Sequence, residues 1–145
     1  MFSVFIPGEP APQGSKKHVG GGVLMDSCKR LPEWRSDVRN GCLDEDGQPK
    51  AKIDGPIFLS LEFALKRPKS LPKTKKVHHT KRPDMSKLVR AVEDAITSAG
   101  IWIDDSYVCT SYVTKRYAEP GEQTGCHIKV MPITDHRSDN DQTTH

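Results

Sequence analysis

Three aspartates, Asp84, Asp104 and Asp105, have the residue type and surroundings that suit metal-assisted chemistry on a phosphate. Asp84 stands among basic residues, and a helical pattern then leads to the adjacent pair Asp104 and Asp105. Mg²⁺ prefers oxygen ligands and keeps several waters, so two or three carboxylates are enough to hold it beside a phosphate. A metal ion held there can polarise the phosphate and lower the pKa of a bound water. Because a helix separates its own ends, the following chain would have to bring Asp105 back towards Asp84.

These acids also have ordinary structural interpretations. Asp84 near the start of a helix interacts favourably with the positive end of the helix dipole, a contribution of about 0.3–1 kcal/mol. Asp104 and Asp105 form an acidic pair that is typical of a turn. Arg90 can pair with an acid three or four residues further along the same helix. Spacing alone therefore does not decide between a metal site and local structure.

The basic residues are concentrated around Asp84. From Lys66 to Arg90 there are ten lysines and arginines against one acid, so this segment carries +9, whereas the whole chain carries +3 and the rest is therefore acidic. A basic segment on an acidic body is typical of a surface that binds a polyanion. A solvated loop is the common alternative for such a run of charges. Aromatic residues make up only 6% of the chain, which argues against a surface that stacks single-stranded RNA.

Four strands are predicted by β-branched or alternating apolar residues, at 2–6, 57–65, 108–117 and 126–133. The strand at 57–65 has apolar residues on both faces, so we expect it at the centre of a sheet. The loop 119–125 predicts a hairpin that pairs the last two strands. Residues 19–26, with three glycines, predict an irregular hairpin or a mobile flap.

Two helices are predicted by apolar residues at helical spacing. In the segment 31–43 they recur every four residues. The second helix carries an apolar stripe from Leu88 to Ala99, with Ser86 as its expected N-cap and Gly100 just beyond its end. The loop 66–83 before this helix contains three prolines, so it should be extended and exposed, its histidines included.

Targeting signals and cysteines give only broad indications. No run of about 18 apolar residues occurs, so no membrane span is expected. The N-terminus lacks the basic and apolar regions of a signal peptide, which makes the cytoplasm the expected compartment. The four cysteines show no metal-binding spacing and are expected to be reduced and structural.

The stretch 78–117 resembles the signature of the RusA-type Holliday-junction resolvases, small metal-dependent endodeoxyribonucleases common in phages and prophages. The likeness consists of Arg-Pro-Asp at 82–84, Asp94-Ala95 followed by Thr97 in the helix, and Gly100-x-Trp102-x-Asp104-Asp105. The resemblance implies a single small α+β domain over 1–133, with a mixed β-sheet packed by two main helices. It also implies a homodimer, for which exposed apolar residues at 57–65 or 31–43 are candidate contacts. A disordered polar tail is expected over 134–145.

The resemblance further implies a Mg²⁺-dependent enzyme, with Mn²⁺ as a possible substitute, that resolves four-way (Holliday) DNA junctions by paired symmetric nicks. It would work in the cytoplasm of a bacterial host or a phage-infected cell. The implied catalytic residues are Asp84, Ser86, Arg90 and Asp105, and the implied metal ligands are Asp84, Asp104 and Asp105. The DNA-binding residues would be Lys16, Lys17, Lys69, Lys73, Lys75, Lys76, Lys81, Arg82 and Lys87.

Ser86 is the departure from the family pattern, because it stands where a second Asp is expected. A hydroxyl is neutral and a weaker ligand than a carboxylate. Three interpretations follow: Asp84, Asp105 and waters hold the metal; another acid such as Asp104 takes over; or cleavage is impaired and the protein only binds junctions.

Overall fold

The structure, a computed structural model that describes residues 1–14 and 27–134, contains one four-stranded mixed sheet. Its strands are β1 (Phe2–Pro7), β2 (Ile57–Leu65), β3 (Val108–Tyr117) and β4 (Gly125–Pro132). Their order is β1-β4-β2-β3, with β4 antiparallel to β1 and β2, and β3 parallel to β2. The predicted α+β class with a mixed sheet is therefore confirmed, as is the central place of β2.

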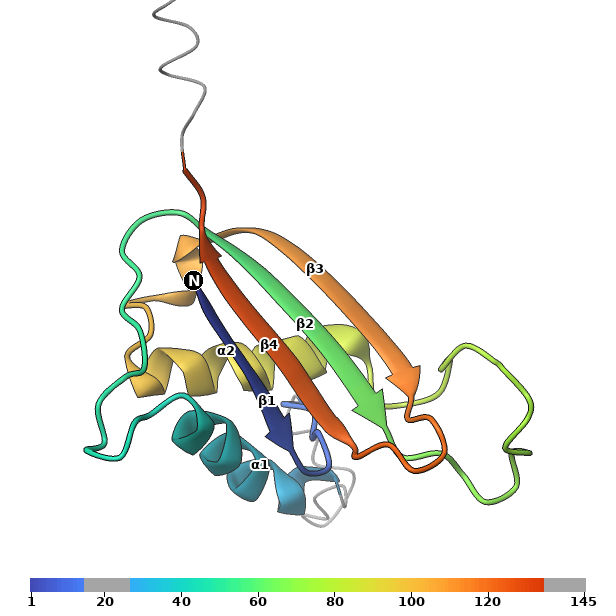
Figure 1. Ribbon diagram of the computed structural model, residues 1–145. Coiled ribbons are helices and arrows are strands. Elements are labelled where there is room, and N and C mark those ends of the chain that lie inside the picture. The colour runs from blue at the N-terminus through green and yellow to red at the C-terminus, as the bar shows by residue number, and fades with distance from the viewer. Residues whose placement is uncertain (15–26, 135–145) are drawn as a thin grey trace, which may run out of the picture.

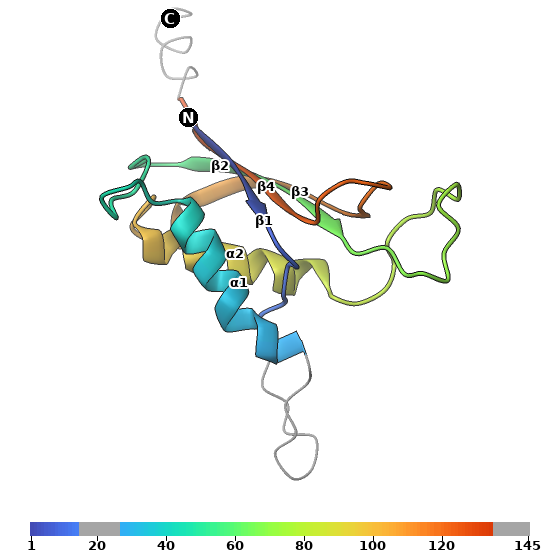
Figure 2. The ribbon, with the colours of Figure 1, turned by 60° about the horizontal axis from the view of Figure 1, so that its bottom comes forward.

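Two helices, α1 (Ser27–Gly41) and α2 (Met85–Ala99), cover the same face of the sheet, as Figures 1 and 2 show. Successive strand residues point to opposite faces, so every second residue of β2 from Ile57 to Leu65 packs towards the helices and is buried. Among the described residues, no helix covers the other face (Figure 2). A short 3-10 turn, η1 (Asp105–Tyr107), connects the end of α2 to β3.

Helix α1 begins four residues earlier than predicted. Its apolar side is the predicted one, because Trp34 and Val38 are buried; Cys42, which directly follows the last residue of the helix, is buried as well. The additional residues include Lys29 and Arg30, which are exposed. Since they add nothing to the apolar period, no sequence pattern marked this first turn.

Helix α2 confirms the predicted stripe except at two positions: Ala91, which was not predicted, is buried, and Val89, which was predicted, is only partly buried. The prediction of Ser86 as N-cap was wrong, because the helix starts at Met85 and Asp84 occupies the N-cap position without a side-chain capping bond. Gly100 ends the helix in the left-handed conformation (φ 86°), where its N–H donates to carbonyls of the last turn.

The predicted hairpin between the last two strands was also wrong. β4 pairs with β1 and β2, so the connection from β3 crosses the end of β2. The mistake has a physical cause: the alternating apolar residues of β4 are buried and suit the middle of the sheet, but sequence does not say which strand lies beside them. At the start of β4, a Cβ on Gly125 would lie 2.1 Å from the carbonyl oxygen of Ile6, so only glycine fits this strand contact.

Several expectations concern surfaces rather than elements. The apolar residues at 57–65 and 31–43 that were candidates for a dimer contact are buried or partly buried inside the domain; the exposed large apolar side chains of the described chain lie elsewhere, for example Tyr112 on the edge strand β3. No described helix has the length and apolar character needed to cross a membrane. Residues 19–26, Lys16, Lys17 and the tail from 135 onwards lie outside the described residues.

Candidate active site

A cavity of about 670 Å³ lies between the polar side of α2, the turn η1 and the edge strand β3. Helix α2 buries its apolar stripe against the sheet, and this orientation directs its polar residues into the cavity. The chemically active residues among those that line it are Ser86, Arg90, Glu93, Asp94, Asp105 and Ser111. Of the four predicted catalytic residues, the cavity thus brings together Ser86, Arg90 and Asp105.

Carboxylates dominate one end of the cavity. Glu93 and Asp94 are partly buried on α2, and Asp105 faces them from η1. Burial raises the pKa of Glu93, and the negative charges of Asp105 and Asp94 raise it further, while Arg90 opposes the shift. Three carboxylates therefore share this end with a single guanidinium, and none of the three forms an ion pair with a described residue.

The neighbouring residues Asp104 and Asp105 have different roles. The Asp104 carboxylate accepts the backbone N–H of Ser106 at 3.0 Å and so caps η1. This bond lowers the pKa of Asp104, with a further lowering from the hydrogen bond that it shares with Asp105. The same shared bond raises the pKa of Asp105, and burial adds to the rise. The Asp104 carboxylate thus stabilises the turn, whereas Asp105 lines the cavity.

Asp84 lies at the other end of the site, just before the first turn of α2. Its side chain is 60% exposed, does not line the cavity, and forms a 3.7 Å ion pair with Lys87. Nine residues separate it from Glu93, which corresponds to roughly 13 Å along a helix. Because Asp84 does not line the cavity that holds Asp105, the two carboxylates do not share one cavity within a single copy of the chain.

The cationic segment forms a loop that projects beyond the end of the sheet between β2 and α2 (Figure 1). Its predicted DNA-binding residues are all exposed, namely Lys69, Lys73, Lys75, Lys76, Lys81 and Arg82. Arg67 instead points inwards and donates to the carbonyls of Pro72 and Lys75, which closes the loop on itself. Most of the loop is exposed as predicted, but the prediction was wrong for His79, which is only 8% exposed and packs its ring on Tyr117 at 4.3 Å.

Sequence reasoning gave no site role to three residues that the structure brings to the site. Glu93 and Asp94 had no assigned function, although Glu93 lies seven residues after Ser86 and hence on the same helix face, a spacing that could have identified it. No sequence pattern indicated Lys115, because its position beside the start of α2 depends on which strands are neighbours in the sheet. Its amine donates to the carbonyls of Lys81 at 2.8 Å and Pro83 at 3.0 Å.

An acidic cavity beside a strongly cationic loop is the combination that a metal-assisted nuclease requires. A family model described as Endodeoxyribonuclease RusA matches residues 7–131, which include both helices and the whole cavity. The chain therefore belongs to the RusA endodeoxyribonuclease family, as the resemblance indicated. A search of curated proteins found no match. The family comprises endonucleases that resolve Holliday junctions in DNA recombination and generally depend on a divalent metal.

The donor set of the cavity fits a divalent metal ion. Burial raises the pKa of Glu93 and the hydrogen bond with Asp104 raises that of Asp105; repulsion between neighbouring carboxylates adds to both shifts, and a bound cation would remove that repulsion. Within residues 1–14 and 27–134, no three acidic, histidine or cysteine side chains are grouped closely enough to hold a metal by themselves. Mg²⁺ is commonly held by one or two carboxylates and keeps water in its other positions. Asp105 with one neighbouring carboxylate therefore suffices chemically.

Proposed function

We propose that this protein is a Mg²⁺-dependent, structure-selective endonuclease that resolves four-way DNA junctions by paired symmetric nicks, acting as a homodimer in the cytoplasm of a bacterial or phage-infected cell. The observation that carries the proposal is the juxtaposition of an unneutralised carboxylate cavity with the exposed cationic loop, in a chain of the RusA family. Neither feature alone specifies a nuclease, since acids are common at turns and cations are common in loops.

In this proposal the acids and the cations have separate tasks. Asp105 and Asp84 hold the ion, with Asp104 as a further acid beside Asp105. When bound, Mg²⁺ supplies a polarised phosphate and an activated water. Arg90 lines the cavity next to the carboxylates, where its charge can neutralise the phosphoryl oxygens of the scissile bond. The loop lysines and Arg82, together with Lys87, bind the DNA backbone and position the strand.

The separation of Asp84 from Asp105 within one copy requires an explanation in this proposal. Either the start of α2 moves when DNA binds, or Asp84 of one copy acts with Asp105 of a second copy. Mixing the variants Asp84→Asn and Asp105→Asn distinguishes the two. Because a mixed dimer would contain one intact pair only if the acids come from different copies, recovered nicking after mixing indicates a shared site. No recovery indicates a site within each copy.

The first test is incubation of the purified protein with a labelled four-way junction and with a linear duplex of matched sequence, with Mg²⁺, Mn²⁺ or EDTA. We expect symmetric, metal-dependent nicks in the junction and none in the duplex. Asp54→Asn is a suitable control variant, because Asp54 is exposed and lies outside the cavity. Equal cleavage of junction and duplex, or cleavage that EDTA leaves intact, would contradict the proposal.

A second candidate function rests on Ser86. This residue lines the cavity where the family pattern has an acid, and it does not cap the helix, so the site has one negative charge fewer. A protein that binds junctions without cutting them would show a salt-sensitive gel shift and no nick at any Mg²⁺ or Mn²⁺ concentration. The variant Ser86→Asp then decides between the two, since gain of nicking would identify the missing carboxylate as the cause.

A further inference from the structure

Lys115 is a basic residue of the edge strand that lies close to the start of α2. It is opposite Phe63 in the parallel register of β2 and β3, and hence on the face that the helices cover. Its amine donates to the carbonyl oxygens of Lys81 at 2.8 Å and Pro83 at 3.0 Å. The second of these carbonyls belongs to the peptide group that contains the nitrogen of Asp84. Lys115 therefore holds the backbone immediately before the candidate catalytic acid.

The charge of Lys115 is committed to this task. Within the described part of the chain it has no carboxylate partner. A hydrogen bond from a charged donor is about twice as strong as one between neutral groups. The side chain is partly buried, so water competes less for the two carbonyls than it would at an open surface.

The same strand holds the neighbouring part of the loop. His79 is buried with its ring on that of Tyr117, two residues after Lys115 on the same face of β3. The returning limb of the cationic loop, residues 79–83, is thus attached to β3 at successive points. Asp84 follows this limb directly, and its carbonyl accepts the first hydrogen bond of α2 from Leu88 at 3.1 Å.

Strand β3 also serves the opposite end of the site. Asp105 lies in η1, which leads directly into β3, and Ser111 on the strand lines the cavity. Strand β3 therefore begins directly after the turn that holds Asp105, and near its end Lys115 binds the backbone just before Asp84. A displacement of β3 relative to α2 would move both acids at once.

We propose that Lys115 is a positioning residue for the nuclease site: it fixes the backbone of Asp84 and couples the cationic loop to that acid. This inference rests on the proposed function, because it assumes that Asp84 takes part in cleavage. It predicts that loss of the amine slows the cutting step and leaves junction affinity almost unchanged. A direct phosphate contact by Lys115 predicts the reverse, with weaker binding and a smaller salt dependence.

The test compares Lys115→Met with Lys129→Met, which removes an exposed lysine from the uncovered face of the same sheet. Single-turnover cleavage with saturating protein measures the cutting step, and junction affinity is measured in EDTA over a range of salt concentrations. We expect Lys115→Met to slow cleavage about 10–100-fold, the size of effect that small displacements of catalytic groups produce. Affinity and its salt slope should match those of Lys129→Met, and Lys115→Arg should recover part of the rate.

Amide hydrogen exchange gives a readout that does not depend on activity. In Lys115→Met, the amides at the start of α2, Leu88 among them, should exchange faster, whereas Lys129→Met should leave them unchanged. If Lys115→Met does not fold, Lys115→Gln, which shortens the donor, is compared with Lys115→Arg in the same assays. Equal cleavage rates for those two variants and the unmodified protein would overturn the inference.

The Asp84→Asn variant distinguishes a failure of the positioning role of Lys115 from a failure of the proposed nuclease function. If Lys115 acts through Asp84, adding Lys115→Met to Asp84→Asn should cause no further loss of cleavage, which a double-mutant cycle measures. If Asp84→Asn itself cuts normally, the assigned role of Asp84 fails, whatever Lys115 does. If Asp84→Asn is inactive while Lys115→Met cuts like Lys129→Met, the positioning role alone fails.

Discussion

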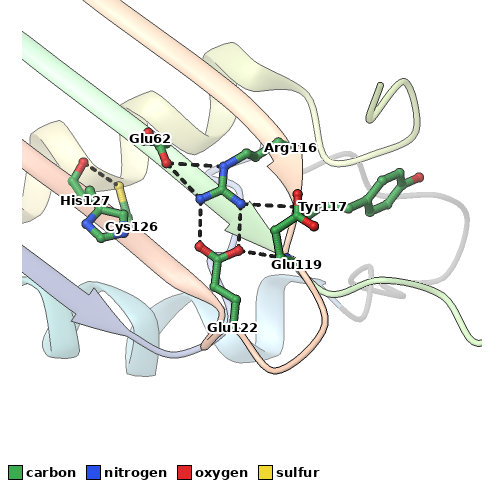
Figure 3. A network of polar contacts seen from close by, with 7 residues as sticks. All are labelled: Glu62, Arg116, Tyr117, Glu119, Glu122, Cys126 and His127. Atoms are coloured by element: carbon green, nitrogen blue, oxygen red, sulfur yellow. Dashed lines mark hydrogen bonds and ion pairs between the residues drawn. The ribbon is translucent and has the colours of Figure 1, made fainter. Parts of the chain in front are cut away.

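The sheet carries a charged cluster on each face, and the two clusters differ in how their charges are balanced. On the uncovered face, Arg116 donates to Glu62 at 2.8 Å and to Glu122 at 2.7 Å (Figure 3). On the helix-covered face, the cavity carboxylates have only Arg90 nearby and form no ion pair with a described residue. The charges of the first cluster are paired with one another, whereas the carboxylates of the second are not.

The pKa values report the same difference. Hydrogen bonds from Arg116 lower the pKa of Glu122 to about 2, and the two carboxylates in turn raise the pKa of Arg116. In the cavity the shifts have the opposite sign, since the pKa values of Glu93 and Asp105 are both raised. A raised pKa means that the ionised carboxylate disfavours the folded state at neutral pH. Such destabilising arrangements are concentrated at functional sites.

The balanced cluster has a structural task that its position explains. The connection from β3 to β4 must cross the end of β2, and Glu122 lies on this connection while Glu62 lies on β2. Arg116 thus joins the crossing segment to the strand beneath it. The bond from the Ala118 amide to the Leu65 carbonyl, at 2.7 Å, supports the same crossing. We therefore expect the uncovered cluster to determine stability and the cavity cluster to determine activity.

Asp105→Asn is the variant that should affect the cavity most. We expect cleavage to fall by more than the roughly 10–100-fold that loss of an outer-shell partner of a metal site causes. Junction binding and the thermal midpoint should be maintained, because the change removes a repelling charge and the Asn amide can still donate to Asp104. Cleavage assays with circular dichroism melting check both parts. Cleavage within a few-fold of the unmodified protein would remove Asp105 from the site.

Arg116→Met should give the opposite result. It leaves the partly buried carboxylates of Glu62 and Glu122 beside each other without a cation, and we expect a loss of about 1–2 kcal/mol after allowing for solvent screening. Thermal melting should show this as a midpoint lower by roughly 4–8 °C. Cleavage per folded molecule should not change below the melting range. A strong loss of cutting with normal stability would contradict the division between the two faces.

Local patterns were sufficient to predict much of the fold. The apolar stripe of α2 identified the helix, and alternation identified β2 as the central strand. The acids at either end of α2 could also be predicted, because each stands at a boundary that sequence marks well. These features depend on residues close to one another in the chain.

The remainder depends on contacts between distant segments. Whether β4 lies beside β3 or between β1 and β2 is a choice among similar apolar surfaces, and the hairpin was the wrong choice. Lys115 became a candidate only when β3 was placed next to the start of α2, 32 residues away in sequence from Pro83. Glu93 became a candidate because Asp105 lies close enough to raise its pKa, and this proximity depends on the turn after the helix.

Glu122→Gln sharpens the comparison through pH. The folded-state pKa of Glu122 is about 2, below its ordinary value of 4.5, so its charge stabilises the fold above about pH 4.5 and that contribution disappears as the pH falls towards 2. We expect the variant to lose about 0.5–1 kcal/mol at pH 7 and to match the unmodified protein near pH 2–3. Urea unfolding at several pH values measures the difference. A gap that stays constant with pH would show that the charge of Glu122 is not responsible.

Glu93→Gln is expected to have the smallest effect on stability, and in the opposite direction. The pKa of Glu93 is raised, so its ionised form disfavours the folded state at neutral pH. Gln in its place should stabilise the fold by less than about 1 kcal/mol at pH 7, and the gain should fade as the pH falls and Glu93 takes up a proton. Thermal melting measures the gain. A lower midpoint at pH 7 would show that Glu93 serves the fold and not the cavity.

Added Mg²⁺ should distinguish the cavity cluster from the cluster on the uncovered face. A ligand that binds only the folded state stabilises it in proportion to its affinity, and the cavity carboxylates are the group that a divalent cation would neutralise. Mg²⁺ should therefore raise the midpoint of the unmodified protein more than that of Glu93→Gln. Glu122→Gln should respond like the unmodified protein, because Arg116 already serves the uncovered cluster. Equal responses in all three would place the cation elsewhere and end the distinction between the two faces.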